Sequence, residues 1–305
     1  MLGLGQSRVL DGEERTQALG VLPVVVLVAG TSAILVKFSS APSPVKVSYR
    51  LAFATLGFLT FSGIYYRDHF ADFDRRDLSL AAVSGVVLGL HYLLWFESLV
   101  WTTVAASTTL AQTQTIFVAI LAYVALGETI TRRTVFGICF AFAGAAVMSL
   151  GGIATDSLLN GVDPFLGNTL ATAAGLLFAG YLVISRSVRQ RIAVAPYMSV
   201  VHVFATATAF LLAVGTGESV SATSYPVHEW MLFFAMGLGP SFVAQTLSNW
   251  SLKYVASSVV SIAYLGVPIT SSLLAFVLLS EVPGVGTVVG GVLTLSGIYV
   301  TVRQH

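Results

Sequence analysis

Charged residues are scarce in this sequence. Only 10% of its 305 residues are Asp, Glu, Lys or Arg, whereas a soluble domain carries about 25%. Hydrophobic residues make up 56%, and the mean hydropathy is +0.86. The few basic residues are dispersed and the net charge is +1, so there is no basic stripe to hold a nucleic acid. The composition predicts an integral membrane protein with no nucleic-acid partner.

Cysteine is almost absent too. The single Cys139 excludes an intrachain disulfide and a cysteine-based metal site. The glycine-rich stretch "PGVGTVVGG" lacks the GxGxxG spacing and follows no strand pattern, and there is no Walker lysine motif. We therefore expect no cofactor and no nucleotide-driven pump.

Long apolar runs dominate what remains. A membrane helix needs about 20 mostly apolar residues, and the runs are apolar on every side rather than alternating as barrel strands do. The sequence therefore predicts an all-α integral membrane protein with ten transmembrane helices. They are expected near 19–38, 45–66, 78–97, 104–126, 134–152, 166–185, 197–215, 230–250, 256–279 and 284–302.

Basic residues are distributed unequally between the two sides of such a bundle. With the N-terminus inside, the outer connections at 98–103, 153–165, 216–229 and 280–283 hold no Lys or Arg. The inner segments hold 12 of the 15: Arg8, Arg15, Arg67, Arg75, Arg76, Arg132, Arg133, Arg186, Arg189, Arg191, Lys253 and Arg303. The positive-inside rule then places both termini in the cytoplasm. Residues 1–18 are expected to be a cytoplasmic segment of a multi-pass plasma-membrane protein.

The sequence also repeats itself at half its length. "VALGETITRRTVFGICFAFAGAAVM" at 124–148 has an echo in "VLLSEVPGVGTVVGGVLTLSGIYVT" at 277–301. The offset of 153 pairs Glu128 with Glu281, Gly137 with Gly290 and Gly144 with Gly297, and "SPVKVSYR" at 43–50 matches "APYMSVVH" at 195–202 with an offset of 152. Each unit, 19–152 and 166–302, holds five helices. Because five is odd, the units enter the membrane from opposite sides and form an inverted repeat.

These residues resemble a known family. "ASTTLAQTQTIFVAILAYVALGETITRRTVFGICFAFAGAAVM" and "SSVVSIAYLGVPITSSLLAFVLLSEVPGVGTVVGGVLTLSGIYV" look like the two halves of the EamA-like branch of the drug/metabolite transporter superfamily. Pro268, followed thirteen residues later by Glu281, fits the family pattern, whereas Thr115 stands at the proline position of the first half. Whether the fourth helix bends there stays open. The resemblance implies ten helices, an inverted five-plus-five repeat and transport of small organic molecules.

Polar and aromatic side chains within the predicted helices are the candidate substrate contacts. Amide groups and ring faces suit a small amphiphile. In an alternative interpretation, such amides only hold membrane helices together. The candidates are Tyr92, Trp95, Gln112, Gln114, Tyr181, Gln245, Asn249 and Tyr264.

Ionisable residues at membrane depth are costly and are candidates for gating or coupling. Arg50 and its repeat mate His202 could line opposite ends of the path, or could bond backbone carbonyls of neighbouring helices. Glu97 is expected near the outer mouth, at the depth of Lys37 and Lys46, where it could pair with a cation as a gate or simply be solvated. His91 is either a proton carrier, because imidazole titrates near neutral pH, or a packed side chain.

The function that these features predict is secondary transport of small organic metabolites, amino acids or related compounds, by alternating access, with export as the expected direction. The alternative is an intramembrane enzyme acting on lipid-like substrates, which would need paired carboxylates, a histidine cluster or an HExxH motif. Partners are a small-molecule substrate and the lipid bilayer. A homodimer through small-residue helix faces stays open, because those faces can equally serve internal packing.

Overall fold

The computed structural model describes residues 12–126, 131–154, 162–189, 191–255 and 257–302. All regular elements within these ranges are helices. Glu128, one of the repeat positions, lies outside the described residues.

The helices form ten membrane crossings, as the sequence predicts. Three crossings are interrupted: α4 continues into α5, α9 into α10 through the π-helix η4, and α11 into α12. Eight crossings are long and apolar enough to span a membrane by length and composition within the described residues, and the shorter apolar helix of α13 and the 23-residue α6 complete the set. The bounds are α1 Gly12–Phe38, α2 Ser43–Tyr65, α3 Arg75–Trp101, α4 Val104–Ala111, α5 Gln114–Leu126, α6 Arg132–Ala154, α7 Pro164–Val188, α8 Val194–Gly215, α9 Val227–Met236, η4 Gly237–Val243, α10 Ala244–Ser251, α11 Ser257–Tyr264, α12 Gly266–Leu279 and α13 Val285–Val302, with short 3₁₀ helices at Arg67–Asp72 and Ala222–Ser224.

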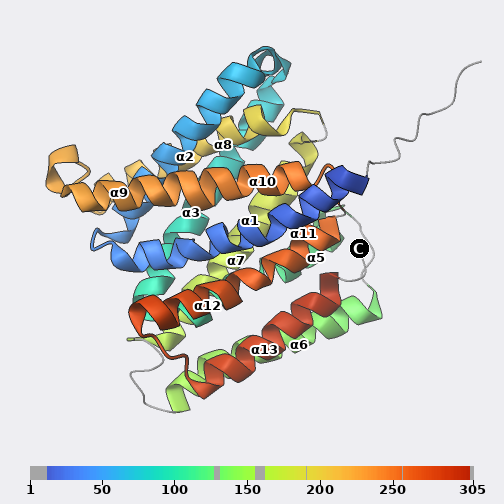
Figure 1. The fold of residues 1–305 in the computed structure, drawn as a ribbon, viewed down its shortest axis with the longest axis vertical. Helices are drawn as coiled ribbons and strands as arrows, with labels where there is room; N and C mark the ends of the chain where they lie inside the picture. Colours follow the sequence, from blue (N-terminus) through green and yellow to red (C-terminus); the bar gives the residue numbers. More distant parts are fainter. Residues whose placement is uncertain (1–11, 127–130, 155–161, 190, 256, 303–305) are drawn as a thin grey trace, which may run out of the picture.

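We name the two ends of the bundle after the direction in which α1 runs. The N-terminal face is the end where α1 begins and where α10 and α13 end, at the right of Figure 1. The distal face is the opposite end, where α1 and α12 end and α9 begins. The first and last helices thus start and finish at the same face, as an even number of crossings requires.

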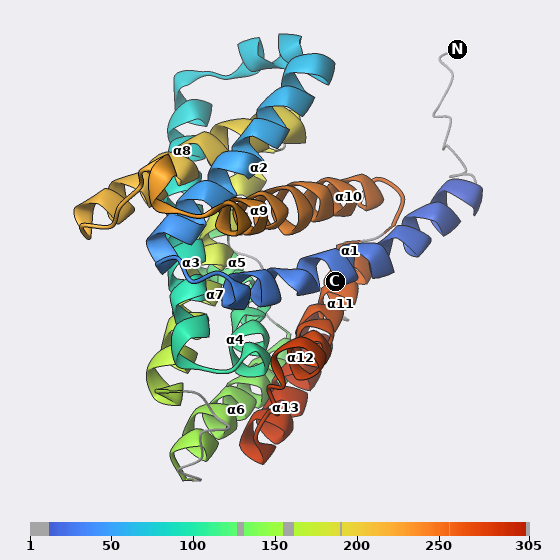
Figure 2. The ribbon, with the colours of Figure 1, turned by 60° about the vertical axis from the view of Figure 1, so that its left-hand side comes forward.

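Repeat-related helices pack in matching ways. α6 lies antiparallel against α13 (Figures 1 and 2), and α3 packs on α7 as α10 packs on α1. A Cβ built on Gly144 would lie 2.6 Å from the Gly290 carbonyl oxygen, and one on Gly290 would lie 2.6 Å from that of Gly144. Gly137 and Gly297 meet in the same way. Only glycine lets two backbones approach this closely, so the repeated glycines fix the α6–α13 pair.

The change of repeat offset from 152 to 153 has a structural cause. α9 begins at Val227, which is 152 residues after Arg75 at the start of α3, but Gln245 lies opposite Tyr92 at an offset of 153. The π-helix η4 lies between these positions, and a π-turn accommodates an extra residue. Its Pro240 has no N–H, and the hydroxyl of Ser241 donates to the Met236 carbonyl at 3.1 Å.

The fourth and ninth crossings break at equivalent positions. α11 ends at Tyr264, and Pro268 cannot donate the helical hydrogen bond to the Tyr264 carbonyl. Gln112 Nε2 donates to that oxygen at 2.8 Å instead. In the first half, α4 ends at Ala111 without a proline, and the hydroxyl of Thr113 bonds the Leu110 carbonyl at 2.5 Å. The fourth crossing therefore does bend, at Gln112 and Thr113 rather than at Thr115.

Candidate functional site: a central cavity between the repeats

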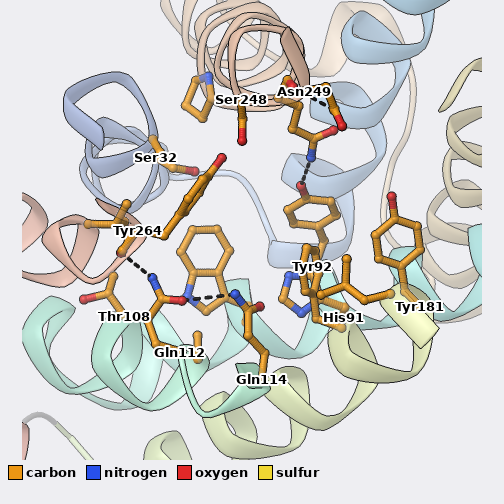
Figure 3. A pocket seen from close by; sticks show the side chains of 18 of the residues that line it. Ser32, His91, Tyr92, Thr108, Gln112, Gln114, Tyr181, Ser248, Asn249 and Tyr264 are labelled. Atoms are coloured by element: carbon orange, nitrogen blue, oxygen red, sulfur yellow. Dashed lines mark hydrogen bonds between the residues drawn. The ribbon is translucent and has the colours of Figure 1, made fainter. Parts of the chain in front are cut away.

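A cavity of about 290 Å³ lies at the centre of the bundle, between the two repeats. Both halves contribute to its wall, and Figure 3 shows the labelled side chains arranged around a shared space. All eight predicted substrate contacts line it, namely Tyr92, Trp95, Gln112, Gln114, Tyr181, Gln245, Asn249 and Tyr264. The structure therefore brings together residues that are up to 172 positions apart in the sequence, from Tyr92 to Tyr264.

Hydrogen bonds already orient several of these amides. Gln112, which bonds the Tyr264 carbonyl, accepts a bond from Gln114 Nε2 at 3.0 Å. Gln245 Nε2 lies 3.4 Å from the Tyr92 hydroxyl, a long contact between repeat-related residues. Gln112 thus holds two helices together, as the alternative interpretation of the amides has it, while also lining the cavity. Among the described residues, Gln245 Oε1 and Trp95 Nε1 are buried without a hydrogen-bond partner.

Arg50 closes the distal end of the cavity. Its side chain is 2% exposed, and its guanidinium donates to the hydroxyls of Ser241 and Ser32, both at 2.7 Å. The guanidinium carbon lies 4.4 Å from the ring centroid of Tyr92 and 5.7 Å from that of Trp95. Cation–π contacts of this kind stabilise a desolvated cation. Arg50 thereby joins α1, α2, α3 and η4 at one point.

The two histidines differ in their access to the cavity. His91 lines it, and His91 Nδ1 lies 2.8 Å from the Ala174 carbonyl. Because a carbonyl only accepts, this nitrogen carries the proton and Nε2 of the neutral ring is an acceptor. His202 lies outside the lining, buried beside Phe58, with Nδ1 2.8 Å from the Met198 carbonyl. The repeat mates Arg50 and His202 therefore occupy different environments.

Glu97 forms its side-chain hydrogen bond with Trp101 and not with one of the predicted cations. Its carboxylate accepts from the indole nitrogen of Trp101 at 3.0 Å, and it does not line the cavity. No ion pair between Glu97 and Lys37, Lys46 or Arg50 forms in the part of the chain that the structure describes. Instead Lys37 donates to the Thr102 carbonyl at 3.4 Å and Lys46 to the Val36 carbonyl at 3.2 Å. Both lysines satisfy carbonyls at helix ends, where cations are favoured.

Two glutamates complete the closure of the distal face. Glu281 accepts from the backbone N–H of Val104, at the start of α4, at 2.6 Å. Burial raises the pKa of Glu281, and the charge of Lys37 opposes this shift. Glu229 accepts from the hydroxyl of Ser39 at 2.5 Å and from the N–H and hydroxyl of Ser40, both at 2.7 Å. The α1–α2 connection is thus bound to the start of α9.

The cavity extends to the N-terminal face. Its wall there includes Arg189, the C-cap residue of α7, and the exposed Leu252 beyond α10. Arg189 donates to the Asn249 side-chain oxygen at 2.9 Å. Beside the opening, Arg191 bonds the buried Asp77 and lies 3.7 Å from Asp74. The hydrogen bond from the Asp77 N–H is the main cause that lowers the pKa of Asp74.

The cavity wall also contains residues that the sequence patterns do not predict. Thr108 lies one helical turn before Gln112, Phe178 lies three residues before Tyr181, and Ser248 lies between Gln245 and Asn249. Positions three and four apart share a helix face, so extending each predicted residue by one turn would have found them. The sequence predicts Arg189 only as part of a cytoplasmic segment, because the length of an apolar run does not show that the end of α7 faces the cavity.

A protein family and two relatives that this chain resembles are described as transporters. A family model described as the EamA-like transporter family matches residues 18–150 and 165–303. An uncharacterized transporter of Archaeoglobus fulgidus is 29% identical over 231 residues, which cover 75% of this chain and 76% of that protein. The uncharacterized transporter YyaM of Bacillus subtilis is 25% identical over 235 residues, which cover 73% and 76%. A solved crystal structure with 19% identity has a TM-score of 0.61 and covers 94% of this chain and 97% of its own, which shows a shared fold.

Proposed function

The chain belongs to the EamA-like transporter family, and from that premise we propose that it is a secondary transporter that moves small organic molecules by alternating access through the central cavity. One observation carries the proposal: eight polar and aromatic side chains from both repeats converge on one cavity that is closed at the distal face and reaches the N-terminal face. A binding site at the interface of inverted repeats is where an exchange of conformations between them alternates access.

We assign the N-terminal face to the cytoplasm. The basic residues concentrate in segments at that face, in agreement with the positive-inside rule. The structure would then represent an inward-facing state, ready to load a cytoplasmic substrate. Export of amino acids or related compounds follows as the expected direction. The family is one of transporters, and no feature of the described residues favours an intramembrane enzyme.

Counterflow in liposomes tests this proposal. Purified protein is reconstituted with a trapped pool of amino acids and small metabolites, and mass spectrometry follows their exchange with labelled pools outside. One compound class should exchange faster than in empty liposomes. Trp95→Leu, which alters the cavity wall, should reduce the exchange at least about tenfold, whereas Trp250→Leu, on α10 outside the lining, should leave it within about twofold. Exchange no faster than in empty liposomes, by folded and inserted protein, would contradict the proposal.

A further inference from the structure

We propose that the substrate is an organic anion whose carboxylate binds at Arg50, with its apolar or aromatic body against the rings of Tyr92 and Trp95. This inference rests on the proposed function, because it takes the central cavity as the transport site. It adds a charge requirement and a named recognition residue to that site.

The charge of the cavity wall carries the argument. The side chains that line the cavity include two arginines, Arg50 and Arg189, and no Asp or Glu among the residues that the structure describes there. Arg189 bonds the neutral Asn249, and Arg50 bonds two neutral hydroxyls. Neither arginine is within ion-pair distance of an acidic side chain in the described ranges. The field in the cavity is therefore positive, which favours an anionic ligand over a cationic one.

The surroundings of Arg50 are suited to a carboxylate. A charged side chain at membrane depth costs roughly 2.5 to 3.5 kcal/mol or more, and such residues are usually paired. Here the guanidinium lies at the end of the cavity with an unpartnered donor nearby, Trp95 Nε1, on a ring whose centroid is 5.7 Å from the guanidinium carbon. A planar carboxylate accepts from a guanidinium and from an indole N–H at the same time. Binding would supply the counter-charge that the described chain does not.

The rest of the wall indicates what the carboxylate is attached to. Phe178, Tyr181 and Tyr264 present rings between Arg50 and the N-terminal opening. Gln245 Oε1 is a buried acceptor without a partner among the described residues, so a neutral donor on the ligand body, such as a hydroxyl, would satisfy it. Among the described residues, the wall has no acidic side chain to bind an ammonium group. A monocarboxylate with an aromatic body that carries a hydroxyl therefore satisfies the described groups better than an organic amine does.

Equilibrium binding to the full-length protein in nanodiscs tests this inference without requiring transport. The probes share one shape and differ in charge: labelled phenylacetate, with phenylacetamide and phenethylamine as competitors. Phenylacetate should bind at least about tenfold more tightly than the amide or the amine, because hydrogen bonds to charged groups are the stronger ones. Arg50→Gln should remove the preference, and Arg50→Lys should keep part of it.

Lys46→Gln is the matched control. Lys46 is also a buried cation of α2, one helical turn from Arg50, but it does not line the cavity. This variant should bind phenylacetate within about threefold of the unmodified protein, because its charge does not touch the ligand. Equal binding of the neutral amide, a preference that survives in Arg50→Gln, or no binding of phenylacetate by folded protein would each overturn the inference. A failure of counterflow with intact phenylacetate binding would instead count against the proposed transport function.

Discussion

One pair of repeat-related residues forms a contact at both faces of the bundle, whereas a second repeat-related pair forms different contacts at the two faces. At the distal face Glu229 binds Ser39 and Ser40, and at the N-terminal face Asp77 binds Arg191. Asp77 and Glu229 are 152 residues apart, as are Ser39 and Arg191. Each repeat therefore uses a buried carboxylate to hold the connection between the first two helices of the other repeat, and both contacts are formed although only one face is open.

A second pair of equivalent residues behaves differently. Lys37 at the distal face bonds the Thr102 carbonyl and so joins α1 to the end of α3. Its counterpart Arg189, 152 residues later, bonds Asn249 within α10 and lines the open cavity. In the proposed alternating-access cycle, contacts formed at both faces need not change, and contacts formed only at the closed face make up the gate.

The largest loss of stability is expected from a substitution between α6 and α13, a helix pair that runs from one face of the bundle to the other. Gly144→Ala places a Cβ 2.5 Å from the Thr294 amide nitrogen and 2.6 Å from the Gly290 carbonyl oxygen, so the helices must separate. Such overpacking costs about 1 to 3 kcal/mol or more. Thermal unfolding followed by fluorescence-detected size exclusion should show a clear fall in Tm. Gly63→Ala, which would meet no atom within 4 Å, should show none; an equal fall in both would refute the role of the glycine contact.

The next largest loss of stability is expected from substitutions of the two buried carboxylates, Glu229 and Asp77. Glu229→Gln replaces an oxygen that accepts several hydrogen bonds by a donating amide, and should destabilise the fold by about 2 kcal/mol. Asp77→Asn should cost less, about 1 kcal/mol or below, because the Arg191 side chain is 50% exposed and water can replace its partner. The same unfolding assay ranks the two variants. A larger loss of Tm in Asp77→Asn than in Glu229→Gln would show that the exposure of Arg191 does not lower the cost of losing this contact.

A smaller effect is expected at Glu281, whose contact belongs to the gate. Glu281→Ala leaves the N–H of Val104 without its acceptor, and loss of a helix cap costs about 1 kcal/mol, roughly a fivefold change in population. Ser32→Cys, a cavity position near Arg50, reports opening through its labelling by an impermeant reagent from the distal face, in a Cys139→Ser background. The alanine variant should label about fivefold faster. Glu281→Gln keeps an acceptor oxygen without the buried charge and should label no faster than the unmodified protein; an alanine variant indistinguishable from it would remove Glu281 from the gate.

Lowering the pH at the distal face should favour the closed state of the gate that contains Glu281. The pKa of Glu281 is raised by burial in the closed state, whereas a solvated carboxylate in the open state returns to its ordinary value. The closed state then binds the proton more tightly, so lowering the pH through the raised pKa favours closure. Labelling of Ser32→Cys from the distal face should slow as that side is acidified. The slowing should be absent in Glu281→Gln, and its persistence there would assign the effect to another group.

Much of this arrangement could be predicted from the sequence. The lengths of the apolar runs fix the ten crossings, and the odd number in each repeat fixes their inversion, because both depend only on local composition. The eight cavity residues could be found because polar side chains in an apolar helix seldom face lipid. Side-chain partners were harder: Glu97 bonds Trp101 four residues away rather than a lysine of another helix. Which acceptor lies nearest depends on helix rotation, which hydropathy does not determine.

The smallest effect concerns the one departure from the family pattern, Thr115. Its N–H bonds the Gln112 carbonyl at 3.1 Å in the first turn of α5, and Pro268 occupies the equivalent first turn of α12. Proline is tolerated in a first turn, so Thr115→Pro should cost less than about 1 kcal/mol and keep the fold. Val118→Pro, in the middle of α5, should cost about 3 kcal/mol. Comparable Tm losses in the two variants would mean that the break in the fourth crossing lies further along than Gln112 and Thr113, and that the two halves do not bend at matching positions.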